Sequence, residues 1–90
     1  MLELIYTSTF KKSYKLMIKR GYDKTLLENV LKKLIIGEPL SPNNHFHLLK
    51  GKYSGMFECH IKPDWLLIFY YKFDNQVLVL VDTGTHSDLF

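Results

Sequence analysis

Residues 56–72, with the sequence MFECHIKPDWLLIFYYK, decide the fold class, because two different strand patterns follow each other there. Residues 56–61 alternate between two faces, and Glu58 and His60 share one of them. A proline–aspartate pair then marks a turn. Residues 65–72 are apolar on both faces, which is typical of a central strand that is covered on both sides. The segment therefore predicts two successive strands of one sheet.

Apolar residues at spacings of three and four predict two helices before this segment. The first helix has a cap at Thr7-Ser8 and ends at Gly21, and the second is capped by Asp23 and stops at Gly37. Residues 2–6, ahead of both helices, are apolar and favour a strand.

The chain beyond the central segment predicts one more strand. Residues 73–76 form a hairpin turn, residues 77–81 the last strand, and residues 83–90 a polar tail. The order is β-α-α-β-β-β, and the predicted fold class is α+β. Two N-terminal helices pack on one face of a mostly antiparallel four-stranded sheet, whose other face is either wet or functional. We expect residues 1–90 to form a single domain.

The composition excludes several classes of protein. The single cysteine rules out an intramolecular disulfide framework and a zinc cluster built on cysteines. The longest apolar run, residues 65–71, has seven residues, whereas a membrane-spanning helix needs about 20. No secretory signal is visible, and lysines appear from Lys11 onward. We therefore expect a small soluble protein of the cytoplasm that does not use a membrane.

The net charge of +3 is unevenly distributed along the chain. Residues 1–62 hold eleven bases and five acids, a local charge of +6, whereas residues 63–90 hold one base and four acids, a local charge of −3. The first predicted helix carries a run of bases without an acid among them, formed by Lys11, Lys12, Lys15, Lys19 and Arg20. Such a run either attracts a polyanion or an acidic partner, or is the solvated face of a helix.

The histidines are the candidates for proton transfer, because an imidazole both takes and gives a proton near neutrality. His47, His60 and His86 can converge on one edge of an antiparallel sheet, and Asp64 either orients an imidazole or is a turn aspartate bonded to its own backbone. The alternative is a set of scattered surface histidines. No spacing among them matches a compact pair of metal ligands, although His45 and His47 give a weak signal, so we expect no metal site.

Three stretches of the chain resemble the motifs of one family. Residues 58–70 (ECHIKPDWLLIFY), 83–90 (TGTHSDLF) and 47–51 (HLLKG) are similar to the central motif, the C-terminal signature and the histidine-leading loop of the YafQ-type toxins. These toxins belong to the RelE/ParE superfamily of bacterial toxin–antitoxin systems. The stretches stand in the family's order, and the predicted order of elements is also that of the RelE-like fold.

The resemblance implies a metal-independent endoribonuclease that needs no cofactor and cuts mRNA, typically in the ribosomal A site. In such a reaction a base takes the proton of a ribose 2′-hydroxyl, whose oxygen attacks the phosphorus. An acid then protonates the departing 5′-oxygen, which leaves a 2′,3′-cyclic phosphate. The positions that match the family's catalytic set are His47, His60, Asp64, His86 and Phe90. We assign His86 as the acid and His47 or His60 as the base, supported by Asp64, and expect Phe90 to order the site.

Members of this family often carry arginines where this chain has Phe57 and Asp82, and arginine is the better clamp for phosphate. Trp65 and Glu58 belong to the predicted RNA-binding set, although Trp65 is alternatively a core anchor and Glu58 alternatively the polar face of a strand. The side chains that we expect to replace the arginines are Lys50, Lys52 and Lys62.

A toxin of this kind implies a cognate antitoxin protein as partner, besides mRNA and the ribosome. The basic run in residues 11–20 is the predicted docking surface for an acidic antitoxin segment or for ribosomal RNA. Two other functions fit the sequence. One is a non-catalytic toxin of the superfamily that binds a protein target, although the gyrase-poisoning members lack these histidines. The other is a basic RNA-binding module without chemistry.

Overall fold

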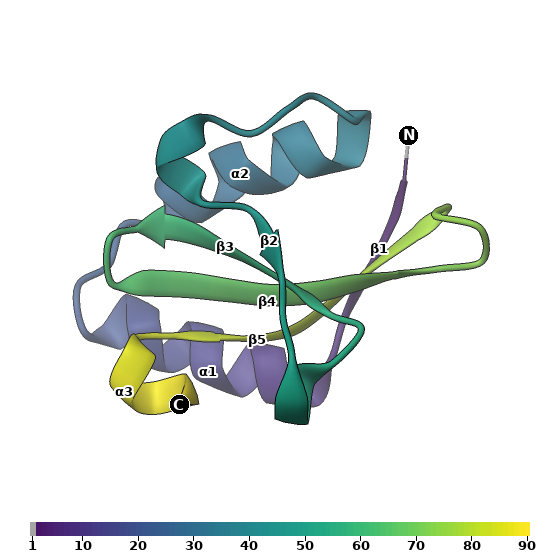
Figure 1. The fold of residues 1–90 in the computed structure, drawn as a ribbon. Coiled ribbons are helices and arrows are strands. Elements are labelled where there is room, and N and C mark those ends of the chain that lie inside the picture. The colour runs from purple at the N-terminus through teal and green to yellow at the C-terminus, as the bar shows by residue number, and fades with distance from the viewer. Residues whose placement is uncertain (1) are drawn as a thin grey trace.

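The computed structural model describes residues 2–90 as helices packed on a central sheet (Figure 1). The elements in chain order are β1 (Glu3–Tyr6), α1 (Ser8–Lys19), α2 (Lys24–Ile36), the 3₁₀ turn η1 (Pro42–Asn44), β2 (His47–Leu48), the 3₁₀ turn η2 (Gly51–Tyr53), β3 (Phe57–Lys62), β4 (Trp65–Lys72), β5 (Val77–Gly84) and α3 (His86–Leu89). The predicted α+β class is confirmed.

The caps explain where the two long helices begin and end. The hydroxyl of Thr7 accepts the backbone N–H of Phe10, and the carboxylate of Asp23 accepts that of Thr25. Gly37 ends α2 with a left-handed φ of 79°, a conformation that glycine adopts without steric cost. The two helices predicted from apolar spacing and caps are therefore confirmed.

The sheet has five strands in the order β1-β5-β4-β3-β2, and β1 runs parallel to β5 while the other neighbours are antiparallel. The predicted four-stranded sheet was therefore wrong by one strand. The missed strand, β2, has only two residues, which is too short for a visible alternation. The strand predicted over residues 77–81 also continues further, to Gly84.

The main core lies between the sheet and the helices α1 and α2. It contains Phe10 and Met17 of α1, four buried residues of α2, and inward-facing residues of β3, β4 and β5. Strand β4 is buried on both sides from Trp65 to Phe69, as its apolar sequence predicts. Among the helices of residues 2–90, none is long and apolar enough to cross a membrane.

The opposite face of the sheet carries a second, smaller core and the third helix. Leu66 and Ile68 of β4 pack there against Leu89 of α3. The prediction of a polar tail was therefore wrong, because residues 86–89 form a helix. Four residues are too few to show an apolar period, and the capping box of Thr85 and Asp88 is the local signal that starts the helix. Figure 1 shows α3 beside α1 at the end of β5.

Candidate active site

The candidate catalytic side chains stand on the sheet face that α1 and α2 leave free. In the pairing of β3 with β4, Glu58 lies opposite Ile68 and His60 lies opposite Leu66, so both share the face of the second core. His47 lies opposite Glu58 in the pairing of β2 with β3. The register thus brings two of the predicted histidines to the same place.

Glu58 is the buried centre of this group. Only 4% of the residue is exposed, and its Oε1 lies 3.2 Å from Nε2 of His60 and 3.4 Å from Nε2 of His47. A buried carboxylate remains charged only where hydrogen bonds or opposite charges replace its water. His60 lies within hydrogen-bond distance of the Glu58 carboxylate and His47 within ion-pair distance, so one carboxylate faces both rings.

A backbone carbonyl fixes the orientation of His47. Its Nδ1 lies 2.7 Å from the carbonyl oxygen of His45, which can only accept, so Nδ1 carries the proton and Nε2 faces Glu58. His45 itself has a left-handed φ of 45°, and the preceding turn is tied to β3 because the Asn44 amide donates to the carbonyl of His60 at 2.7 Å.

His86 and Asp64 form a second pair. Oδ1 of Asp64 accepts the backbone N–H of His86 at 2.9 Å and lies 2.6 Å from its Nδ1. These two bonds, the backbone one first, lower the pKa of the Asp64 carboxyl below its ordinary value. The sequence predicts Asp64 as the support of the base, whereas in the structure its carboxylate contacts His86, the predicted acid. The turn between β3 and β4 brings the carboxylate to the start of α3.

The group around Glu58 and the His86–Asp64 pair meet at His60. Its ring centroid lies 5.7 Å from that of His86, 6.4 Å from that of His47 and 5.0 Å from that of His45. A cleft beside the rings of His45 and His60 is also lined by Lys62. Imidazoles at such spacings suit proton transfer at two neighbouring oxygens of one phosphodiester.

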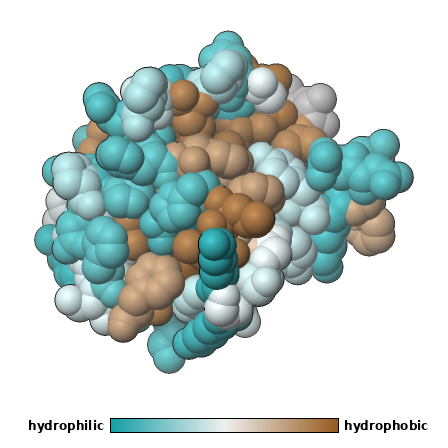
Figure 2. Space-filling model, in the orientation of Figure 1, coloured by the Kyte–Doolittle hydropathy of each residue, from teal (hydrophilic) through white to brown (hydrophobic). Residues whose placement is uncertain are grey.

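Phe90 closes one side of this face. It packs edge-on against Tyr53 of η2, with ring centroids 5.7 Å apart, yet 63% of Phe90 remains exposed. Figure 2 views the side of the molecule that carries β2 and α3, and shows brown apolar groups exposed among teal polar ones. An exposed aromatic ring held by a second ring is suited to stack on a base.

The predicted RNA-binding residues fall into two groups. Trp65 is fully buried and its indole N–H donates to the hydroxyl of Thr83 at 2.9 Å, so it anchors the core and is withdrawn from the RNA-binding set. Glu58 is also too buried to touch RNA and faces the two imidazoles instead. The side chains at the remaining three positions are exposed, namely Lys50, Lys52 and Lys62.

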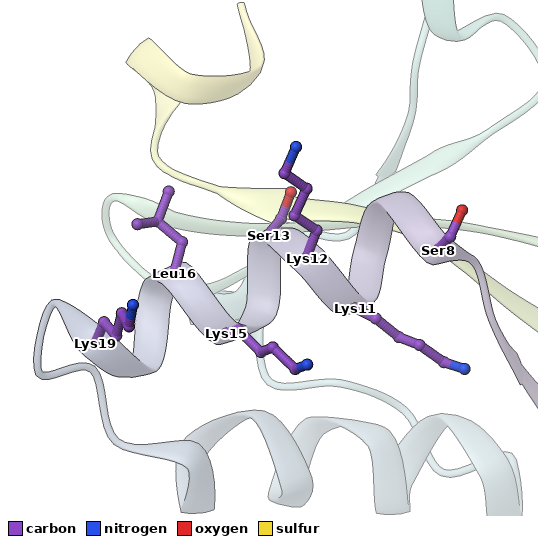
Figure 3. Close-up of a pocket in the computed structure, with 7 residues that line it drawn as sticks. All are labelled: Ser8, Lys11, Lys12, Ser13, Lys15, Leu16 and Lys19. Carbon is purple, nitrogen blue, oxygen red and sulfur yellow. The ribbon is translucent and has the colours of Figure 1, made fainter.

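The basic run of the first helix forms an exposed surface on α1. Figure 3 shows a shallow pocket there, with Lys12 and Leu16 on one side of the helix and Lys11 and Lys15 on the other. Arg20 differs from the lysines, because its guanidinium binds the carboxylate of Asp88. The surface is predominantly cationic and includes one exposed apolar residue, Leu16.

Sequence reasoning left two neighbours of the site unassigned. The sequence indicates His45 only as a weak metal signal. Its backbone carbonyl orients the ring of His47, and no side-chain pattern encodes the orientation of a carbonyl. Tyr53 lies in a short 3₁₀ turn, and its contact with Phe90 joins residues 37 positions apart. No group of three or more His, Cys, Asp or Glu side chains in residues 2–90 has a geometry that could hold a metal ion.

Comparisons with known proteins agree on one family. Residues 2–90 match the model of the family described as bacterial toxin of type II toxin–antitoxin system, YafQ. The mRNA interferase toxin YafQ of Escherichia coli K12 is 35% identical over 89 residues, which cover 98% of this chain and 95% of that protein.

Solved structures show the same likeness. A metal-bound toxin from Helicobacter pylori is 40% identical with a TM-score of 0.92, and the match covers 100% of both chains. The toxin in the E. coli DinJ–YafQ complex is 32% identical with a TM-score of 0.89, covering 100% of this chain and 99% of that one. Similarity of both sequence and fold thus extends over essentially the whole chain.

Proposed function

This chain belongs to the YafQ family of toxins of type II toxin–antitoxin systems, and on that premise we propose how its histidines cut RNA. It is an mRNA interferase, and hence an endoribonuclease. The observation that carries the mechanism is the position of the His60 ring within 6.4 Å of the rings of both His47 and His86.

His60 acts as the general base. Its Nε2–H donates to Glu58, which leaves Nδ1 as the nitrogen that takes the proton of the ribose 2′-hydroxyl. The imidazolium that forms then faces a buried carboxylate, and this charge pairing stabilises the protonated product of the step. The freed 2′-oxygen attacks the adjacent phosphorus.

His47 acts as a cation rather than as a second base. Its Nδ1 already donates to a carbonyl, and its Nε2 lies 3.4 Å from Oε1 of Glu58, so a positive charge on the ring would pair with that carboxylate. A positive charge there stabilises the developing charge on the phosphoryl oxygens.

His86 acts as the general acid. Its Nδ1–H is directed at Asp64, and the ring therefore offers Nε2–H to the departing 5′-oxygen. Asp64 accepts the backbone N–H of His86 and lies within hydrogen-bond distance of its ring Nδ1, so the carboxylate fixes the orientation in which the ring meets the substrate. The bond from oxygen to phosphorus breaks as that proton is delivered, which leaves a 2′,3′-cyclic phosphate.

RNA is held by charge and by stacking. We assign the exposed Lys50, Lys52 and Lys62 to the phosphates, while Phe90 stacks on a base against Tyr53. The chain's single arginine, Arg20, is paired with Asp88, so phosphate binding rests on the ammonium groups of lysines alone. The substrate is mRNA, bound at the ribosome, and the site of action is accordingly the cytoplasm.

Product analysis tests the mechanism. The wild-type protein, given ribosome-bound mRNA or a short RNA, is expected to leave a 2′,3′-cyclic phosphate at the same rate with and without EDTA. His60→Ala and His86→Ala should each lower the cleavage rate by about 10²–10⁴-fold, because each removes one proton-transfer group. Mass spectrometry of the products identifies the ends.

The controls separate this mechanism from its rivals. Ser87→Ala changes an exposed neighbour of His86 and should cut RNA at the wild-type rate. A substrate with a 2′-deoxynucleotide at the cleaved linkage should stay intact. Cleavage that EDTA abolishes, or products that end in a 3′-hydroxyl, would contradict the mechanism and favour a metal-dependent reaction.

As a type II toxin, the protein has a cognate antitoxin as its partner. The proposed docking surface is the basic face of α1, formed by Lys11, Lys12, Lys15 and Lys19 (Figure 3). Its pocket holds Leu16, which is exposed, so an acidic segment with one apolar anchor fits both its charge and its shape. Ribosomal RNA is the competing occupant of the same lysines.

A further inference from the structure

The chain's single arginine, Arg20, holds the short C-terminal helix. Arg20 caps the end of α1, and its guanidinium forms a two-pronged pair with Asp88 of α3. Nη1 lies 2.6 Å from Oδ2, and Nη2 lies 3.2 Å from Oδ1. The pair joins residues 68 positions apart, and none of the proposed RNA contacts uses it. Figure 1 shows the two helix ends side by side.

Asp88 links Arg20 to the start of α3. Its Oδ2 accepts the backbone N–H of Thr85 at 2.9 Å and the hydroxyl of Thr85 at 3.0 Å. The guanidinium of Arg20, followed by the bond from Thr85, holds the pKa of the Asp88 carboxyl well below its usual range. The carboxylate is therefore charged at neutral pH, where it pairs with Arg20.

The helix that carries His86 depends on such outside contacts. A helix of four residues does not hold its shape alone, because nucleation costs more than its few hydrogen bonds return. Leu89 anchors its far end in the second core. Asp88 fixes the near end of the helix. Asp88 packs so close to Gly84 that a Cβ at position 84 would lie 2.9 Å from the Cβ of Asp88.

We propose that Arg20 is a positioning residue for RNA cleavage, acting through Asp88 to hold α3 where His86 meets Asp64 and stands beside His60. The proposal rests on the function assigned above, in which His86 is the acid. Arg20 itself touches neither the RNA nor the reacting atoms. It sets the angle at which α3 presents the imidazole.

Because the Arg20–Asp88 pair is partly exposed, its effect on the position of His86 can be measured apart from its effect on folding stability. The side chains of Arg20 and Asp88 are 38% and 31% exposed, and ion pairs of that kind contribute little to folding. A displacement of about 1 Å in a catalytic group, by contrast, can cost about 100-fold in rate. Loss of Arg20 should therefore lower kcat while the protein stays folded.

The experiment compares Arg20→Gln, Arg20→Lys and Asp88→Asn with the wild type, using a short RNA substrate. Arg20→Gln and Asp88→Asn should lower kcat about tenfold to 100-fold with KM within about twofold, because the acid is misplaced while RNA binding is intact. The kcat of Arg20→Lys should lie between those of Arg20→Gln and the wild type, because lysine keeps the positive charge but cannot form the two parallel hydrogen bonds. Asp88→Asn retains an oxygen that can accept from Thr85, so it tests the pair if Arg20→Gln does not fold.

A second readout follows the His86 ring by NMR in the RNA-free protein. The Nδ1 proton that Asp64 holds should exchange with water faster in Arg20→Gln than in the wild type. Lys32→Gln removes the same charge from an exposed position on α2 and should change neither kcat nor the His86 signal.

Three outcomes would overturn the proposal: an unchanged kcat, an unchanged His86 signal, or a rise in KM alone, which would mean that Arg20 binds RNA directly. If the wild type cut no RNA, the proposed mechanism would fail, but the His86 signal would still decide whether Arg20 positions that ring.

Discussion

At the scale of single residues, Glu58 sets the electrostatics of the site. An isolated buried carboxylate loses several kcal/mol of solvation, and here the rings of His47 and His60 replace the lost water. Its Oε1 lies within 3.4 Å of Nε2 of both rings, so one carboxylate faces both imidazoles. In the proposed mechanism Glu58 therefore acts on RNA cleavage through the histidines, because it is too buried to touch the RNA itself.

Asp64 gives a test at acid pH. Hydrogen bonds from His86 lower the pKa of the Asp64 carboxyl below its ordinary value of 3.8. The stabilisation by this pair is therefore complete above that value and is lost as the pH falls through the lowered pKa. Asp64→Asn keeps an acceptor but no charge, so its Tm should lie below that of the wild type near neutrality, and the gap should close in acid.

Thermal unfolding of both proteins from neutral to strongly acid pH measures the gap. Asp74→Asn, in the exposed turn between β4 and β5, removes one carboxylate without a histidine partner and should show no such closure. A gap between wild type and Asp64→Asn that stays constant over the whole range would show that the charge of Asp64 contributes nothing to the pair.

At the scale of elements, length decides what the sequence predicts. The helices α1 and α2 and the strand β4 are long enough to show a period and have caps or turns at their ends, and all three were predicted. The elements β2 and α3 have two and four residues and show no period, so they were missed. Both are held by partners distant in sequence.

The same limit applies to the site. Residue types and the period of β3 placed Glu58 and His60 on one face, and the structure agrees. The partner of Asp64 could not be predicted, because its contact with His86 arises only when β4 and β5 pair and bring residues 22 positions apart together. Burial of Trp65 followed from its place at the head of an apolar strand.

Gly84 tests the junction between β5 and α3. A Cβ at this position would lie 2.9 Å from Cβ and 3.1 Å from Oδ2 of Asp88, so Gly84→Ala must push α3 away from the strand. We expect a loss of about 1–3 kcal/mol in the free energy of unfolding, the usual cost of overpacking, and slower RNA cleavage because His86 moves with the helix. Chemical denaturation and a cleavage assay measure the two effects.

Ser87→Ala, on the exposed side of the same helix, is the matched control and should change neither quantity. If Gly84→Ala were as stable and as active as the wild type, the close packing of Asp88 against the strand would have no part in holding α3.

At the scale of the whole molecule, the sheet separates two surfaces of different use. The lysines of α1 lie on the helix that covers one face, and the histidines lie on the other face. The charge follows this division in part, with +6 in residues 1–62 and −3 in residues 63–90. An acidic antitoxin segment docked on α1, as we propose, would therefore leave the proposed catalytic face open.

Charge reversal on α1 tests this arrangement. Changing Lys11, Lys12 and Lys15 to glutamate should lower the association rate with the cognate antitoxin by at least about tenfold, because steering by opposite charge is lost. The matched control reverses Lys24, Lys32 and Lys33 on α2, which changes the net charge equally on another helix. Surface plasmon resonance at two salt concentrations measures both variants against the antitoxin and against ribosomes. Equal antitoxin binding by the α1 variant and the wild type would exclude α1 as the docking surface, and a selective loss of ribosome binding would assign it to ribosomal RNA.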